Sequence, residues 1–252
     1  MVLTRTLLAL LAIGTSLVAA DAPSSENLKA EDVIAKARGA IAKEPKFLER
    51  IKGLHFEAKS ADQDGKPSGY VILQIVPPFN RRQINYTADY SAEVTNCSNG
   101  LEGWTTKREV RQGGRAEMGV IGFAEVARMK DMAINDLTFY AAPEAGTGTV
   151  TSKGQNEING RKVNSLQYSY KTGYNLIRHF DVQTNLLAAT DYIDAKGEAL
   201  RQQVDDTQWV EGVAFAKKET VFVGGKKVAE ITYEKVLINP EVSDSSFAFP
   251  QR

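Results

Sequence analysis

The chain has 252 residues, and 42% of them are hydrophobic, which is enough for a sizeable core. Basic and acidic residues balance at 31 each, so neither a global positive field nor a dense basic block is present to bind nucleic acid. One cysteine, Cys97, excludes an internal disulfide framework, so stability must come from burial.

Residues 1–20 have the pattern of a secretory signal peptide. Arg5 provides the positive charge, and Leu7–Val18 is an apolar stretch too short to span a bilayer. The small residues before Asp21 predict cleavage after Ala20, and no cysteine lies there to carry a lipid. We therefore expect residues 21–252 to be one exported, soluble domain that does not span a membrane and that acts as a monomer.

The mature chain is expected to begin with a helix. From Ala30 to about Lys52, apolar residues such as Val33, Ile34, Ala37 and Ile41 recur at spacings of three and four, and Pro45 interrupts the pattern. After Leu54 the period changes to two, which predicts a strand over His55–Ala61.

The segment Gly69–Thr106 is predicted to form extended strands separated by turns. Pro77-Pro78 ends the apolar stretch Gly69–Val76, and Asn99-Gly100 favours a tight turn. Arg81 and Arg82 are neighbours on the second of these strands, so their side chains point to opposite faces. The sequence leaves open which of the two points inward.

The segment of about 117–142 breaks the strand pattern and is predicted to be one or two helices, because Ala, Met and Glu are frequent in it. Three of the four methionines of the chain fall here, at Met118, Met129 and Met132. Flexible methionine side chains suit either ordinary core packing or a pliable cover over an apolar cavity, and both interpretations stay open.

From residue 150 onward, turns recur roughly every ten residues between alternating strands, the pattern of an antiparallel meander. Both halves together give on the order of eleven strands, a sheet that must twist, curl or close. The predicted fold class is mainly β with flanking helices (α+β), a curved antiparallel sheet forming an unclosed barrel whose mouth the N-terminal helix and the helical insert cover.

Motifs for catalysis, metal binding or phosphate binding were not found, so we expect a protein that is not an enzyme and has no cofactor or metal. An enzyme would need polar groups that converge inside the barrel, such as Arg81 or Arg82 with His179 and Asp181. Sequence alone cannot place these residues together.

The order of these features resembles the LolA/LolB-like superfamily of periplasmic lipoprotein carriers and sorting proteins. The similarity lies in Ile75-Val76-Pro77-Pro78-Phe79-Asn80-Arg81-Arg82, in Asn99-Gly100-Leu101-Glu102-Gly103-Trp104, and in the ending Ile238-Asn239-Pro240 to Phe247-Ala248-Phe249-Pro250. It implies an unclosed barrel that holds lipoprotein acyl chains beneath covering helices. It also implies that Arg81 or Arg82 tethers the closed lid.

The function expected from this resemblance is a periplasmic, non-catalytic carrier or binder of lipoprotein acyl chains or another apolar ligand. Envelope proteins of the inner or outer membrane are possible partners, and nucleic acid is not. The alternative is a regulatory, sensory or structural interaction module with a self-filled barrel. The residues expected to line the cavity and its lid are Val71, Leu73, Ile75, Arg81, Arg82, Trp104, Met118, Ile121, Phe123, Met129, Met132, Leu166, Tyr168 and Tyr170.

Overall fold

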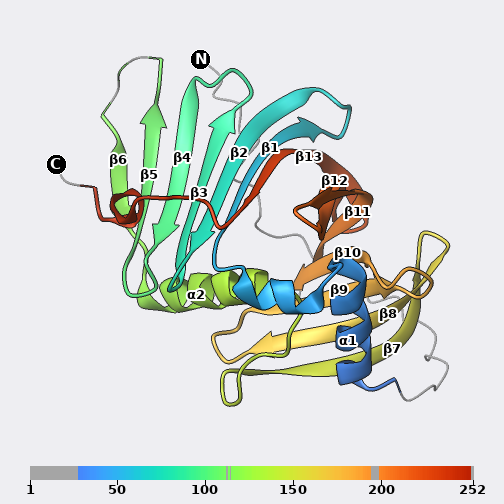
Figure 1. The fold of residues 1–252 in the computed structure, drawn as a ribbon. Helices are drawn as coiled ribbons and strands as arrows, with labels where there is room; N and C mark the ends of the chain where they lie inside the picture. Colours follow the sequence, from blue (N-terminus) through green and yellow to red (C-terminus); the bar gives the residue numbers. More distant parts are fainter. Residues whose placement is uncertain (1–27, 112, 114, 194–198, 251–252) are drawn as a thin grey trace.

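A computed structural model describes residues 28–111, 113, 115–193 and 199–250. The predicted signal peptide and its cleavage site lie outside these residues. The described chain forms a 13-stranded antiparallel sheet in the order β6-β5-β4-β3-β2-β1-β13-β12-β11-β10-β9-β8-β7 (Figure 1). Strands β6 and β7 end the sheet on its two sides and do not pair with each other, so the curled sheet is an unclosed barrel, as predicted.

The sheet is a meander in two halves. The first half contains β1 (Leu54–Asp62), β2 (Pro67–Val76), β3 (Asn80–Thr87), β4 (Ala92–Ser98), β5 (Gly103–Glu109) and β6 (Glu117–Val120). The second half contains β7 (Gly148–Ile158), β8 (Arg161–Tyr170), β9 (Asn175–Asp181), β10 (Leu187–Ile193), β11 (Ala199–Val210), β12 (Val213–Val223) and β13 (Lys226–Ile238). Pairing of β1 with β13 joins the two halves.

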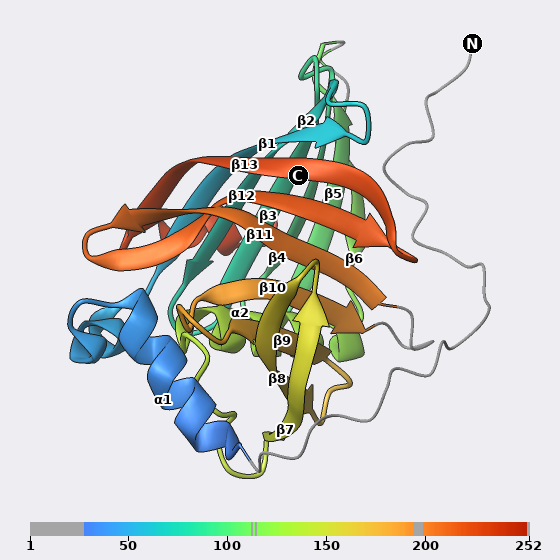
Figure 2. The same cartoon turned by 90° about the vertical axis from the view of Figure 1, so that its right-hand side faces the viewer.

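Hairpin turns connect the strands of the sheet, and β-bulges bend them. Asn159 and Gly160, between β7 and β8, both have positive φ, at 49° and 77°, the conformation that a two-residue hairpin turn requires. Register shifts interrupt several ladders, including β1–β13 at Glu57/Ala58 and β7–β8 at Ser152/Gln155. Each such bulge bends its strand and increases the local twist. Figure 2 shows the long strands β11–β13 arching across the molecule.

The sheet has two strands more than the sequence predicts, and both are at its edges. Residues 117–120, expected to be helical, form β6, which pairs with β5. Strand β7 is polar and largely exposed, so its sequence lacks a clear apolar alternation. An edge strand pairs on one side only and needs less apolar patterning than a central strand.

In the described part of the chain, two α-helices and two 3₁₀ helices accompany the sheet: α1 (Ala30–Ile41), η1 (Pro45–Arg50), α2 (Phe123–Leu137) and η2 (Asp244–Phe247). Helix α1 packs its apolar side, through Val33, Ile34 and Ala37, against Leu166, Tyr168 and other residues of the second half of the sheet. Within the described residues, no helix is sufficiently long and apolar to cross a membrane.

The two faces of the sheet have different covers. We call the face that α1 and α2 contact the inner face; it carries Ile75, Leu166 and Tyr168. The opposite face is the outer face, where Phe247 of the C-terminal segment packs with Cys97 and Trp104. In the C-terminal segment Phe247 is therefore buried against the sheet, whereas Phe249 stays partly exposed.

Candidate ligand-binding site on the inner face

Helix α2 lies across the mouth of the unclosed barrel, along the lower ends of β3–β6 in Figure 1. It contacts β3 and β4 and closely approaches Gly103 at the start of β5. A Cβ atom added to Gly103 would lie 2.9 Å from Cγ2 of Val126, so a glycine allows this close packing. The N-terminal end of α2 therefore rests on the first half of the sheet.

The C-terminal half of α2 is bonded to the second half of the sheet through Asn135. The guanidinium of Arg178 on β9 donates from Nη2 to Asn135 Oδ1 at 2.5 Å. Asn135 Nδ2 in turn donates to the hydroxyl of Tyr170 on β8 at 2.8 Å. One turn earlier, Thr172 donates to Asp131 Oδ2 at 2.6 Å. These bonds tie the helix across the opening.

The C-terminal end of α2 is held by α1 and β8. Arg38 on α1 donates from Nη1 to the carbonyl oxygens of Thr138 and Phe139, at 2.6 and 2.9 Å. These carbonyls lie just beyond the helix, where a cation compensates unsatisfied acceptors and the negative end of the helix dipole. The Tyr168 hydroxyl donates to the carbonyl of Tyr140 at 2.7 Å.

Arg178 is the most deeply placed cation of this region. Its side chain shares the inner face with Leu176 and Phe180, and only 7% of the residue is exposed. The guanidinium carbon lies 4.7 Å from the ring centre of Tyr140 and 5.1 Å from that of Tyr168, the arrangement of a cation–π contact. Its Nη1 atom has no hydrogen-bond partner within the described part of the chain.

The strand register resolves which arginine of the Arg81-Arg82 pair points inward. Arg81 is opposite Ile75 and Ser98, and Ser98 is opposite Gly103, which contacts α2; Arg81 therefore lies on the inner face. Arg82 is opposite Cys97, beside Trp104, on the outer face. Gln83 Oε1 accepts from Arg81 at 3.4 Å, and Arg81 Nε has no partner among the described residues.

The predicted tether of the lid is therefore differently placed. No hydrogen bond between Arg81 and α2 occurs in the described residues, whereas Arg178, which the sequence analysis did not single out, bonds directly to the helix. Arg81 contributes a positive charge to the same inner space, because it and Arg178 both lower the pKa of Asp136 on α2. Burial has the larger effect and raises the pKa of Asp136.

A second buried carboxyl group is on β12. Burial raises the pKa of Glu219 to about 7, against the smaller effect of a hydrogen bond that Tyr233 donates at 2.9 Å. Tyr233 is opposite Ala58 of β1, so this pair lies on the inner face where the two halves of the sheet meet. The inner face thus has titratable groups as well as apolar ones.

The apolar part of the inner face lies on β1, β2 and β12. Phe56 makes edge-to-face contacts with Phe215 and Tyr233, with ring centres 5.8 and 5.9 Å apart. Val71 and Leu73 are opposite Ala58 and Phe56, so they point to the same side. All except Ala58 are only half-buried although they point inward. Apolar surface of these side chains therefore remains accessible on the inner face.

The residues predicted to line the site divide into three groups. Val71, Leu73, Ile75 and Arg81 lie on the inner face, as do Leu166, Tyr168 and Tyr170, which α1 already covers. On α2, Met129 is buried and Met132 packs beside the same cluster, whereas Phe123 is 87% exposed. Arg82 and Trp104 lie on the outer face. Met118 is on β6 rather than on a helix, and Ile121 lies between β6 and α2, beside Gly103.

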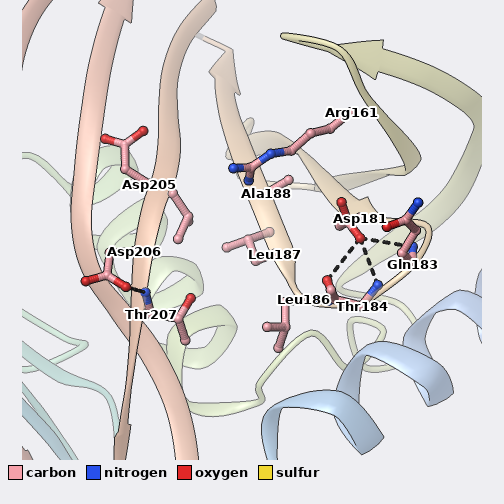
Figure 3. Close-up of a pocket in the computed structure, with 11 residues that line it drawn as sticks. Arg161, Asp181, Gln183, Thr184, Leu186, Leu187, Ala188, Asp205, Asp206 and Thr207 are labelled. Atoms are coloured by element: carbon pink, nitrogen blue, oxygen red, sulfur yellow. Dashed lines mark hydrogen bonds between the residues drawn. The ribbon is translucent and has the colours of Figure 1, made fainter.

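A groove of about 430 Å³ lies elsewhere, where β10 and β11 separate (Figure 3). Pairing of these strands ends at Ala189 and Gln203, so Val204–Val210 of β11 has its ladder on β12 alone. Carboxylates around the groove already have partners: Asp181 accepts from Thr184, and Asp205 accepts from Thr220 at 2.6 Å. The groove is polar and is not the apolar site that the sequence predicts.

A serine–histidine–aspartate chain crosses the outer face. The Ser165 hydroxyl lies 2.7 Å from Nδ1 of His179, and His179 Nε2 lies 3.1 Å from Asp191 Oδ2. Burial raises the pKa of Asp191, but hydrogen bonds from Arg201 and His179 outweigh it and bring the pKa to about 2. Ser165 is only 1% exposed, so no substrate reaches its hydroxyl. This network joins strands β8–β11.

The strand register also separates the residues that the sequence analysis considered as a catalytic arrangement. His179 and Asp181 point to the outer face, whereas Arg81 points inward, so these three residues do not converge. Asp181 instead accepts hydrogen bonds from the backbone of Gln183 and Thr184 in the following turn.

The sequence matches no protein-family model, and it matches none of the curated proteins. The fold, however, is similar to solved structures. A DUF1329 family protein from Desulfovibrio piger has a TM-score of 0.56 at 12% identity, over 87% of this chain and 97% of the other. A LolA superfamily protein from Nitrosomonas europaea has a TM-score of 0.54 at 11% identity, over 88% and 98%.

A third similar structure is a putative outer membrane lipoprotein-sorting protein domain from Vibrio parahaemolyticus. Its TM-score is 0.52 at 14% identity, and the alignment covers 86% of this chain and 97% of the other. All three alignments span nearly the whole described chain, including both halves of the sheet. Together with the unclosed 13-stranded sheet and the helix across its mouth, they show that the chain has a LolA/LolB-like fold.

Proposed function

We propose that this protein binds the acyl chains of lipoproteins or another apolar ligand on the inner face of its half-barrel, without catalysis, and carries them through the periplasm. The observation that carries the proposal is the half-buried apolar set Phe56, Val71, Leu73 and Phe215, which points to the inner face. An inward apolar surface that stays accessible is unfavourable in water and favours a ligand that covers it.

The energetics suit a reversible carrier. Burying a methylene group gains about 0.8 kcal/mol, so ten or more methylenes give useful affinity. Polar bonds hold α2 over the mouth, and they can break and re-form while the core beneath α1 stays packed. A self-filled barrel is not favoured, because the inward side chains Val71 and Leu73 of β2 are only half-buried.

The location and assembly belong to the same proposal. We infer export through a signal peptide cleaved after Ala20, a single domain over residues 21–252, and a monomer that meets inner- or outer-membrane envelope proteins when it loads or releases its ligand. The lipoprotein-sorting name of the similar domain from Vibrio parahaemolyticus supports this setting.

The test is a titration of delipidated protein with a fluorescent fatty acid and with a triacylated peptide. The proposal expects saturable binding, with α2 protected from hydrogen exchange in the bound protein. Absence of saturable binding by a protein whose circular dichroism matches the native fold would refute the proposed function.

A further inference from the structure

Two arginines reach the inner face from opposite halves of the sheet, and both are more than nine-tenths buried. Arg81 on β3 is 8% exposed and Arg178 on β9 is 7% exposed. Each retains a buried guanidinium nitrogen with no hydrogen-bond partner in the described residues, namely Nε of Arg81 and Nη1 of Arg178. Buried cations are costly unless an anion or several acceptors compensate them.

The compensation within the described chain is incomplete. The acceptors of both guanidinium groups are neutral side-chain amides, Gln83 for Arg81 and Asn135 for Arg178. Neither arginine forms an ion pair with a carboxylate of the described residues. Asp136 is near enough for both arginines to influence its pKa, but it too makes no ion pair there.

The outer face offers a comparison within the same molecule. There Arg201 donates two hydrogen bonds to Asp191, at 2.7 and 2.8 Å, in the forked geometry that satisfies a guanidinium. Arg201 thus has a carboxylate partner that compensates its charge. The inner-face arginines lack such a partner although they are more deeply buried than Arg201.

Both arginines lie on the inner face and influence the same buried tyrosines. Arg81 and Arg178 both lower the pKa of Tyr192 and of Tyr174, which burial raises. The inward aromatic and aliphatic side chains Phe56, Val71 and Leu73 lie on the same face of the sheet. The inner face thus combines buried arginines that make no ion pair in the described residues with accessible apolar surface.

We propose that the ligand of this inner face is an anionic amphiphile, whose carboxylate or phosphate headgroup lies between Arg81 and Arg178 and whose acyl tail lies against Phe56, Val71 and Leu73. This inference rests on the proposed function and adds the chemical class of the ligand. Arginine suits the role, because its fork of N–H donors matches the paired oxygens of both headgroups.

The experiment compares a charged and a neutral form of one tail. Delipidated protein is titrated with cis-parinaric acid and with its methyl ester, each followed by fluorescence, in the wild type, in Arg81→Met and in Arg82→Met. Arg82 is the neighbouring arginine on the outer face, so its variant is a matched control. Arg81 has no bond to α2, so its replacement leaves the Asn135 tether in place, unlike replacement of Arg178.

We expect the acid to bind the wild type at least about tenfold more tightly than the ester, the effect of hydrogen bonds to a charged group. Arg81→Met should lose most of this preference with unchanged ester affinity, and Arg82→Met should keep it. Equal affinity of acid and ester in the wild type would overturn the inference and leave the proposed function standing. Binding of neither probe would overturn both.

A competition arm identifies the headgroup. Bound cis-parinaric acid is displaced with oleate, with lysophosphatidic acid and with the neutral lipid monoolein. Displacement at lower concentration by oleate supports a carboxylate, and by lysophosphatidic acid a phosphate. Displacement by monoolein as readily as by either anion would contradict an anionic headgroup site.

Discussion

Arg178 on β9 and Asn135 on α2 form a buried hydrogen bond of 2.5 Å, and this bond fixes the helix over the open side of the sheet. The asparagine also donates to Tyr170, so one amide joins a cation and a phenol on two neighbouring strands. The pair defines the closed position of the helix.

Replacing Asn135 with Ala should therefore loosen α2. The change removes the acceptor of a buried cation and the donor to Tyr170, which should lower the free energy of unfolding by about 2–4 kcal/mol. Urea denaturation measures this free energy. In the variant, hydrogen exchange should accelerate over Phe123–Leu137 more than over the rest of the chain. Asn175→Ala, at an exposed bond to Gly173, is the control and should change little. Unaltered exchange in α2 would argue against the tether.

Glu219 should make stability depend on pH. Its pKa is raised in the folded state, to about 7 from the ordinary 4.5, so the folded state favours the protonated form. Stability is then fully present below pH 4.5 and decreases as pH rises toward 7 by about 3 kcal/mol. Glu219→Gln keeps an acceptor for Tyr233 but cannot ionise, so it should match the wild type at pH 4 and exceed it at pH 8.

The control for this titration is Glu234→Gln, at the exposed partner of Lys59 on the same sheet. It should have the pH dependence of the wild type. Melting temperatures measured from pH 4 to pH 8 suffice to separate the three proteins. A Glu219→Gln curve parallel to that of the wild type would mean that Glu219 is not the group responsible.

Phe247 should protect the only thiol of the chain. Cys97 is fully buried, its sulfur lies 3.9 Å from the carbonyl oxygen of Phe247, and burial raises the pKa of the thiol to about 12. Phe247→Ala should cost about 3–5 kcal/mol and expose Cys97. The rate of thiol modification by an aromatic disulfide reports the exposure. Phe249→Ala, at a position 42% exposed, should leave the slow rate unchanged, and a slow rate in Phe247→Ala would contradict the packing described.

The local sequence pattern was sufficient to predict most of the fold. Asn159-Gly160 predicts its hairpin turn because both residues tolerate positive φ, and alternation separates Arg81 from Arg82 without any structure. Which arginine points inward could not be predicted, because the answer depends on where α2 packs, a contact distant in sequence. Residues 117–120 were wrongly assigned to a helix for the same reason, since their strand exists only through pairing with β5.

Arg178 carried a signal that could have been found in the sequence. It alternates with Leu176 and Phe180, so a charge lies on an apolar strand face, where burial without a partner is costly. The identity of its partner was not predictable, because Asn135 is 43 residues away and on a helix with little local sign of its orientation. The face of Trp104 could not be predicted, because an apolar side chain can pack on either face of a sheet that is covered on both faces.

The central claim is that an acyl chain lies on the inner face, between α2 and strands β1, β2 and β12. Its most direct test is photo-crosslinking of delipidated protein with a diazirine-bearing fatty acid, followed by mass spectrometry of the labelled peptides. The account predicts labels on Phe56, Val71–Leu73, Phe215 or α2, with competition by unlabelled fatty acid. Saturable labelling confined to the outer face around Trp104 and Phe247, or to the groove beside Asp205, would contradict it.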